Sequence, residues 1–162
     1  ALAAEADILI ENFKPGTLEG WGLGWDALHA ANPGLIMLRI SGYGQTGPYR
    51  DLPGFGAIGE AMGGLRHLTG EPGRVPVRVG VSIGDTLAAL HGVIGILLAL
   101  QHRHVSGRGQ VIDVSRGATV VQVFEDTVGL APASTAVTLT GDIARAVVGE
   151  ELLGRVDVDA GY

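Results

Sequence analysis

Short aliphatic runs, separated by segments rich in glycine and proline, form the first part of the chain. Residues 7–11 (DILIE) and 35–40 (LIMLRI) are such runs, and residues 110–115 (QVIDVS) form a third. Continuous runs of this kind are typical of strands that are buried on both faces of a parallel sheet. Between the first two, TLE and WDAL indicate short helical turns before an Asn-Pro-Gly sequence ends them. The pattern predicts a parallel βαβ unit and a further strand.

The longest apolar segment predicts a helix that runs from Asp85 to about His104, where the glycines of SGRG end it. The preceding run, RVGVSIGD, has an aliphatic residue at every second position, as a strand does. The longest apolar stretch of the predicted helix, residues 86–100, contains His91 and two glycines and is shorter than the ~20 residues that a bilayer requires, so we expect no membrane span. Apolar residues mark one helix face at Leu87, Leu90, Ile94 and Leu97 and another at Val93, Ile96 and Leu100. We therefore expect a central helix that is buried nearly all round.

Weaker patterns flank these elements. Residues 57–65 (AIGEAMGGL) are helix-like but contain three glycines, which lower helix stability. Residues 118–128 are interpreted as a helix, and GDIARAVVGEELLGRV near the C-terminus as an amphipathic helix. We expect two parts: residues 1–128 as part of an α/β domain, and residues 129–162 as a tail with no assigned fold.

The composition describes a protein that folds around a core, since 46% of its 162 residues are hydrophobic and 17% are charged. The chain starts with Ala and opens directly into AEADILIENF, so we expect a piece of a larger protein. A net charge of −6 without a Lys/Arg cluster argues against nucleic acid as a partner. The absence of cysteine excludes thiolate nucleophiles and disulfides and is compatible with a reducing compartment.

The histidines do not indicate a metal site, because none has ligand spacing with carboxylates. His91 lies on the apolar helix and is interpreted as a buried structural residue. His102 and His104 lie near the helix C-terminus, where a positive charge interacts favourably with the helix dipole. No partner of His67 is evident in the sequence.

Asp85 is the strongest candidate for chemistry, because it stands where the strand-like run meets the long helix. At this position a carboxylate would lie near unpaired backbone N–H groups and the positive end of the helix dipole, which keep it ionised. One interpretation is a helix N-cap, for which Asp is a preferred residue. The other is a nucleophile, and both roles are compatible.

The loop between the second strand and the next helix, SGYGQTGPYRDLPGFG at residues 41–56, carries five glycines and two prolines. Loops at the carboxyl ends of parallel strands commonly bind ligands, so we expect ligand contact here. The alternative is that the glycines only permit tight turns.

Several motifs occur in a fixed order: ENFKPGTLEGWGLG, ISGYGQTGPY, PGF, HLTGEPG, VRVGVSIGD and LLALQHRHVSGRGQVIDVS. This order resembles the family III CoA-transferases (CaiB/BaiF), the group related to formyl-CoA transferase, over roughly residues 7–128. The resemblance implies the Rossmann-like, parallel-sheet large domain of a cytoplasmic enzyme that forms an intertwined homodimer. It also implies acyl-CoA and a small carboxylic acid as substrates, with no permanently bound cofactor and no nucleic acid or membrane partner.

The resemblance assigns roles to individual residues. The family's catalytic aspartate lies in the G-D step that begins the long helix, which here is Asp85. CoA contacts are implied at Asn12, Phe13 and Lys14 and at Ile40, Ser41, Gly42 and Tyr43. The carboxylate would attack an acyl-CoA thioester, giving a mixed anhydride and CoA thiolate, which returns to form an aspartyl-CoA thioester before an acceptor acid completes the exchange. A solvated lysine and an ordinary loop aromatic remain the alternatives for Lys14 and Tyr43.

Two departures from the family pattern affect these expectations. Gly20 stands where many relatives carry an arginine, so one expected phosphate contact is missing. Phe55 and Gly56 stand where related racemases carry a His-Asp pair, so racemase chemistry lacks its general base. CoA transfer is therefore the leading hypothesis, with succinate as a guess for the acid. Acyl-CoA racemase chemistry and a catalytically inactive fragment remain the alternatives.

Overall fold

The computed structural model describes residues 2–117, and within them three parallel strands form a sheet in the order β1-β2-β3. The strands are β1 (Ile8–Glu11), β2 (Ile36–Ser41) and β3 (Val111–Ser115). Each lies within one residue of an aliphatic run, so the predicted strands, the parallel βαβ unit and the α/β class are confirmed. The helices predicted over residues 118–128 and near the C-terminus lie outside the described residues.

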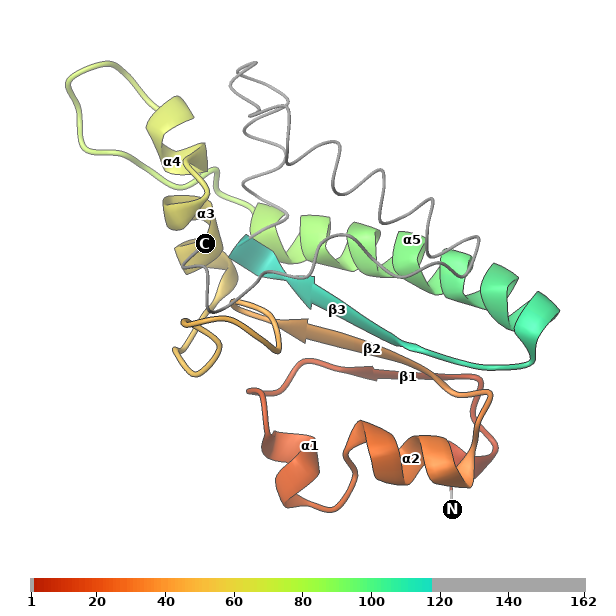
Figure 1. Cartoon of the computed structure of the whole chain (residues 1–162). Helices are drawn as coiled ribbons and strands as arrows, with labels where there is room; N and C mark the ends of the chain where they lie inside the picture. The colour runs from red at the N-terminus through yellow and green to blue at the C-terminus, as the bar shows by residue number, and fades with distance from the viewer. Residues whose placement is uncertain (1, 118–162) are drawn as a thin grey trace.

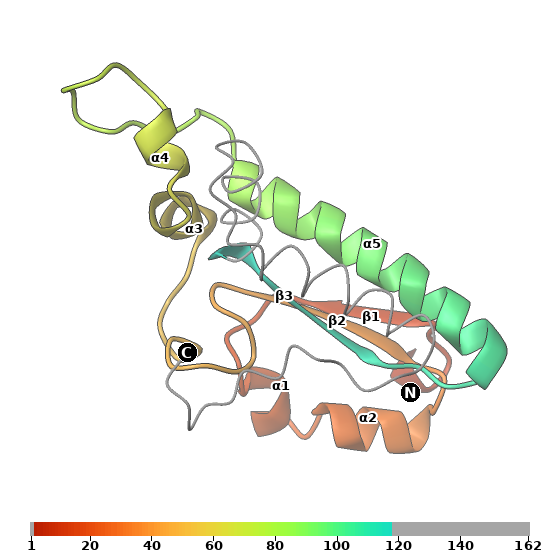
Figure 2. The same ribbon diagram turned by 45° about the horizontal axis from the view of Figure 1, so that its top comes forward.

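Helices cover both faces of the sheet, as Figures 1 and 2 show. The helical elements are η1 (Leu2–Ala4), α1 (Thr17–Gly20), α2 (Trp25–Ala31), α3 (Gly56–Met62), α4 (Leu65–Leu68) and α5 (Ile83–Ser106). α1 and α2 lie on one face and α5 on the other, while α3 and α4 follow the loop at the carboxyl end of β2. The predicted helices before β2 and over residues 57–65 are confirmed, although α4 is a separate turn.

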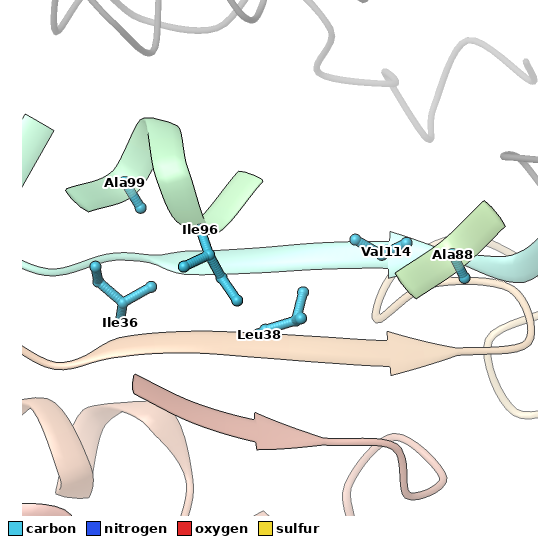
Figure 3. Packing of buried hydrophobic residues seen from close by; sticks show 6 residues of the cluster. All are labelled: Ile36, Leu38, Ala88, Ile96, Ala99 and Val114. Carbon is cyan, nitrogen blue, oxygen red and sulfur yellow. The ribbon is translucent and has the colours of Figure 1, made fainter. Parts of the chain in front are cut away.

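The central strand β2 is apolar at successive positions because both of its faces are buried. Ile36 and Leu38 pack with Ala88, Ile96, Ala99 and Val114 on the α5 side (Figure 3). Leu35 and Met37 pack with Leu18 and Leu28 on the side of α1 and α2. Because successive side chains of a strand point to opposite faces, both layers need apolar residues. Each fully buried aliphatic side chain contributes about 1.5–3 kcal/mol to stability.

Small residues bring α5 close to the sheet. Its buried positions are Gly84, Ala88, Gly92, Ile96 and Ala99. A Cβ at Gly92 would lie 2.8 Å from Cδ2 of Leu38, and one at Gly95 would lie 2.7 Å from Cγ2 of Ile112. The helix therefore approaches the strands too closely for larger side chains at these positions.

The opposite side of α5 is exposed, so the prediction of burial nearly all round is wrong for the described residues. Leu90 is 55% exposed and Leu97 60%, and Val93 and Ile94 are also exposed. Apolar composition shows that a helix can be buried but does not show which of its faces meets a partner. The prediction that length excludes a membrane span is not supported, because α5, with 24 residues, is long and apolar enough to cross a bilayer, and 28% of its most apolar stretch is buried here.

The segment before α5 differs from its predicted form. Residues 75–82 have no regular secondary structure, although alternation predicted a strand from Val77 onward. Val75, Val77, Val79 and Val81 are exposed, and no strand within residues 2–117 pairs with this segment. A strand needs a hydrogen-bonded neighbour as well as an alternating pattern, and the described sheet supplies none at this place.

Asp85 lies inside α5 rather than at its cap, so the N-cap prediction is wrong. The helix begins at Ile83, its N-cap is Ser82, and Asp85 is the acidic residue of the first turn. The positive end of the helix dipole acts over this first turn, in which Asp85 lies. At the other end, Gly107 caps the helix with a left-handed φ of 71°, as the SGRG sequence predicted.

Candidate active site

A cavity of about 660 Å³ opens at the carboxyl ends of the three strands. Its walls come from residues 12–15 after β1, residues 40–42 at the end of β2, residues 52–56 of the long loop, and single residues of α5 and the segment after β3. The predicted site residues that line it are Asn12, Phe13, Lys14, Ile40, Ser41, Gly42 and Asp85. The carboxyl end of a parallel sheet is where such folds bind ligands, because the loops converge there.

The carboxylate of Asp85 faces this cavity and is held by an arginine. Nε of Arg116 donates a hydrogen bond to Oδ1 of Asp85 at 2.5 Å. The Asp85 side chain is 49% exposed, whereas that of Arg116 is 14% exposed. Charge-assisted hydrogen bonds of this kind are short and directional, so they orient the carboxylate. Asp85 therefore combines an oriented oxygen with access to the cavity.

Glycine at position 56 provides the space that the Asp85 carboxylate occupies. A Cβ at Gly56 would lie 2.6 Å from Oδ2 of Asp85, closer than such contacts occur in proteins. A Cβ at Gly84 would lie 3.0 Å from the carbonyl oxygen of Gly56, so the starts of α3 and α5 meet through two glycines. Any larger residue at position 56 would displace the carboxylate.

The long loop folds back onto the end of β2 through a second glycine pair. A Cβ on Gly42 would lie 2.5 Å from Cα of Gly54, and one on Gly54 would lie at the same distance from Cα of Gly42. Gly44 and Gly47 instead adopt a φ of 88°, which other residues rarely adopt. Some glycines of this loop thus permit tight turns, while Gly42 and Gly54 line the cavity.

An ion-pair network beneath the cavity supports residues 12–14. Nε of Arg39 donates to Oε1 of Glu11 at 2.7 Å, and Nη1 donates to Oε1 of Glu19 at 2.7 Å. The other oxygen of Glu11 accepts the backbone N–H of Phe13 at 2.8 Å. Glu11 and Arg39 are buried. The network links β1, β2 and α1 to the loop that lines the cavity.

The pKa shifts in this network reflect its pairing. The hydrogen bond from Arg39 lowers the pKa of Glu19, although partial burial acts in the opposite direction. Burial alone would lower the pKa of Arg39, but hydrogen bonds to Glu19 and Glu11 raise it. Arg39 and Glu19 are therefore charged at neutral pH, and the buried guanidinium is compensated.

Tyr43 is the predicted site residue that does not line the main cavity. Its ring lies 5.7 Å from that of Tyr49 at an interplanar angle of 61°. Its hydroxyl donates to the sulfur of Met62 at 3.2 Å. It lines a second cavity of about 220 Å³ together with residues 46–49. The structure thus separates Tyr43 from the other predicted CoA contacts.

Arg116 is the site residue that the sequence interpretation missed. It follows the last residue of β3 directly and lines the cavity beside Asp85, with which it pairs. A basic residue immediately after a strand, at the edge where ligands bind, was the available signal. The pairing with Asp85 was not predictable, because the two residues are 31 positions apart in sequence.

The remaining polar candidates do not extend the site. His91 is half-buried, and its Nδ1 lies 2.8 Å from the carbonyl oxygen of Leu87, which supports a structural role. Hydrogen bonds to Glu60 raise the pKa of Arg78, and the charge of Asp85 adds to this effect. Within residues 2–117, no group of three His, Cys, Asp or Glu side chains has the arrangement of a metal site.

Comparison with known proteins gives consistent similarities. A family model described as CoA-transferase family III matches residues 1–150. The succinyl-CoA--D-citramalate CoA-transferase of Chloroflexus aurantiacus is 58% identical over 127 residues, which are 78% of this chain and 32% of that protein. The succinyl-CoA--L-malate CoA-transferase alpha subunit of the same organism is 55% identical over 133 residues, 82% of this chain and 30% of that protein.

A solved structure shares the arrangement of these elements. The crystal structure of a CAIB/BAIF family protein from Brucella suis superposes with a TM-score of 0.77 at 42% sequence identity. The match covers 82% of this chain and 35% of that chain. The chain therefore spans about a third of the length of the curated relatives that it matches.

Proposed function

This chain belongs to CoA-transferase family III, and we propose that the full-length protein moves CoA from an acyl-CoA thioester to a small carboxylic acid. One observation carries the proposal within the site. Asp85, in the first turn of α5, faces a cavity that is also lined by the two segments expected to bind CoA. A nucleophile and a binding surface thus meet in one place, at the edge of the sheet where α/β proteins bind ligands.

The proposed mechanism uses Asp85 as a covalent nucleophile. Its carboxylate attacks the thioester carbonyl carbon, the C–S bond breaks, and the electron pair leaves with sulfur as CoA thiolate. The thiolate then attacks the Asp85 carbonyl of the mixed anhydride and releases the donor acid, which leaves an aspartyl-CoA thioester. An acceptor acid repeats these steps in reverse order. The overall reaction converts one CoA thioester into another, so transfer is reversible and needs no other energy source, and the covalent intermediates divide it into easier steps.

The surroundings of Asp85 support this role. The start of α5 favours negative charge and would stabilise the oxyanion that develops on the attacked carbonyl. Nε of Arg116 holds Oδ1, whereas Oδ2 lies against Gly56. Oδ2 is therefore the oxygen that we assign as the attacking atom.

CoA binding is proposed along the two loops that the resemblance indicated. Asn12, Phe13 and Lys14 follow β1, and their backbone is anchored through Glu11 and Arg39. We assign Lys14 to a CoA phosphate, because this residue is exposed and lines the cavity. Ile40, Ser41 and Gly42 would contact the pantetheine arm nearer Asp85.

The substrates are proposed to be dicarboxylic acids, with succinyl-CoA as the donor. The names of the relatives described above contain succinyl-CoA, citramalate and malate. An intertwined homodimer and a cytoplasmic location belong to the same proposal and rest on the family resemblance. Racemase chemistry gains no support from Phe55 and Gly56, because neither residue carries an acid–base group.

The test is an Asp85→Ala variant of the full-length protein, incubated with succinyl-CoA and a second dicarboxylic acid. Transfer should fall by at least about a thousandfold, as expected for loss of a covalent nucleophile. Intact-protein mass spectrometry of the wild type, quenched after succinyl-CoA addition, should show the mass of CoA less one water on Asp85. Asp51→Asn, an exposed carboxylate outside the cavity lining, is the matched control. Sustained transfer by Asp85→Ala would refute the mechanism.

A further inference from the structure

Arg116 presents its guanidinium to the reacting carboxylate from the end of β3. Its Nε lies 2.5 Å from Oδ1 of Asp85, and its side chain is 14% exposed. Both residues line the 660 Å³ cavity, so the pair borders the space in which substrates would react. Arginine at such a place recognises carboxylates well, because its planar donors match the two oxygens.

The proposed reaction changes the charge that faces this arginine. As an anhydride or a thioester, the Asp85 side chain is neutral, so its carboxylate no longer attracts Arg116. No step of the proposed reaction involves a proton of the guanidinium. The position next to Nε then favours another anion, and the acids that leave and arrive during turnover are carboxylates.

We propose that Arg116 binds the carboxylate of the departing and arriving acid whenever Asp85 is acylated. This inference rests on the proposed function and adds to it the group that recognises the acid. In the second half of the reaction, the bound acid attacks the Asp85 thioester carbonyl, the C–S bond breaks and CoA leaves as thiolate. The thiolate attacks the acid's carbonyl carbon in the anhydride, and the C–O bond to Asp85 breaks. Asp85 regains its carboxylate and pairs with Arg116 again.

This exchange makes acid binding depend on the state of the enzyme. In the free enzyme the carboxylate of Asp85 competes with an acid for Arg116, so a free acid binds weakly. Acylation removes the negative charge of Asp85 from this competition. The acid is therefore admitted only when a thioester is present to receive it.

The experiment measures succinate binding by isothermal titration calorimetry to the full-length protein. Asp85→Asn imitates the acylated side chain, because asparagine has the same shape without the charge. This variant should bind succinate at least about tenfold more tightly than the wild type. Adding Arg116→Gln should weaken binding by about tenfold to a hundredfold, the usual range for a lost hydrogen bond to a charged group. Arg116→Lys in the same background should fall between the two.

Controls separate this inference from the function on which it rests. Arg50→Gln in the Asp85→Asn background removes an exposed arginine outside the cavity lining and should leave succinate binding unchanged. Thermal unfolding of each variant shows whether it is folded. Equal succinate affinity with and without Arg116 would overturn the inference, even if the wild type forms the CoA adduct. Absence of that adduct would refute the proposed mechanism, whatever the succinate affinities are.

Discussion

Two arginines at the carboxyl end of the sheet pair with carboxylates in contrasting surroundings. Arg39 is buried, and its guanidinium donates to both Glu11 and Glu19. Arg116 donates to Asp85, whose side chain is half exposed to the main cavity. The first arrangement fixes the loop after β1 through the Phe13 N–H. The second leaves a carboxylate open to the main cavity, so similar ion pairs serve the fold in one place and, in the proposed mechanism, turnover in the other.

The largest effect that tests this contrast is expected from Arg39→Met. The substitution leaves Glu11 buried beside an apolar side chain, and breaking a buried ion pair on one side costs about 3–5 kcal/mol. Urea unfolding of the full-length protein measures the loss. Arg116→Gln should cost less than about 1 kcal/mol, because the carboxylate that it leaves is half exposed. An equal loss of unfolding free energy in the two variants would show that the two ion pairs do not differ in their contribution to stability.

A smaller effect, on rate rather than on stability, is expected from Gly56→Ala. The new methyl group would overlap Oδ2 of Asp85 and displace it from its present position. A misplacement of about 1 Å at a reacting atom lowers turnover roughly a hundredfold. Steady-state transfer between succinyl-CoA and a dicarboxylic acid is the measurement. Gly20→Ala on α1, where the added methyl group would extend into open space, is the matched control and should retain its activity.

The smallest expected effect concerns acid stability and Glu19. Because Arg39 lowers the pKa of Glu19 below its usual value of 4.5, the folded protein binds this proton less readily than the unfolded chain does. The resulting stabilisation is present above pH 4.5 and is lost as the pH falls through the pKa of the folded state. Glu19 is 44% exposed, so the contribution is about 0.5–1 kcal/mol.

Glu19→Gln should remove this part of the acid destabilisation. Unfolding midpoints measured between about pH 3 and pH 7 would then decline less steeply for the variant than for the wild type. Glu71→Gln, at an exposed ion pair with Arg74, is the control. Identical pH profiles for Glu19→Gln and the wild type would show that the Glu19 pair contributes nothing to stability.

Local sequence patterns predicted the helices and strands well, but they predicted contacts between residues distant in sequence poorly. The three strands and α5 follow directly from aliphatic runs and from a glycine that ends the helix. The strand expected before α5 does not form, because no strand in the described part of the chain pairs with it. The exposed side of α5 was equally unpredictable, since its residues are as apolar as those of the buried side.

The candidate site was predictable where it follows a motif. Residues 12–14, residues 40–42 and Asp85, which the family resemblance singled out, lie together around one cavity. Tyr43 lies in a different cavity, because the chain turns at Gly44 and its ring packs on Tyr49. Their functional roles and the division of the chain near residue 128 remain predictions.

The sequence alone determined the order of the elements, the parallel α/β arrangement and the placement of an aspartate at the start of a long helix. These depend on local periodicity, turn residues and motifs, all of which are encoded by neighbours in the chain. Only the tertiary structure brought Arg116 to Asp85 and placed Gly56 against its carboxylate. Such contacts join residues distant in sequence, and their geometry follows from how the helices pack on the sheet.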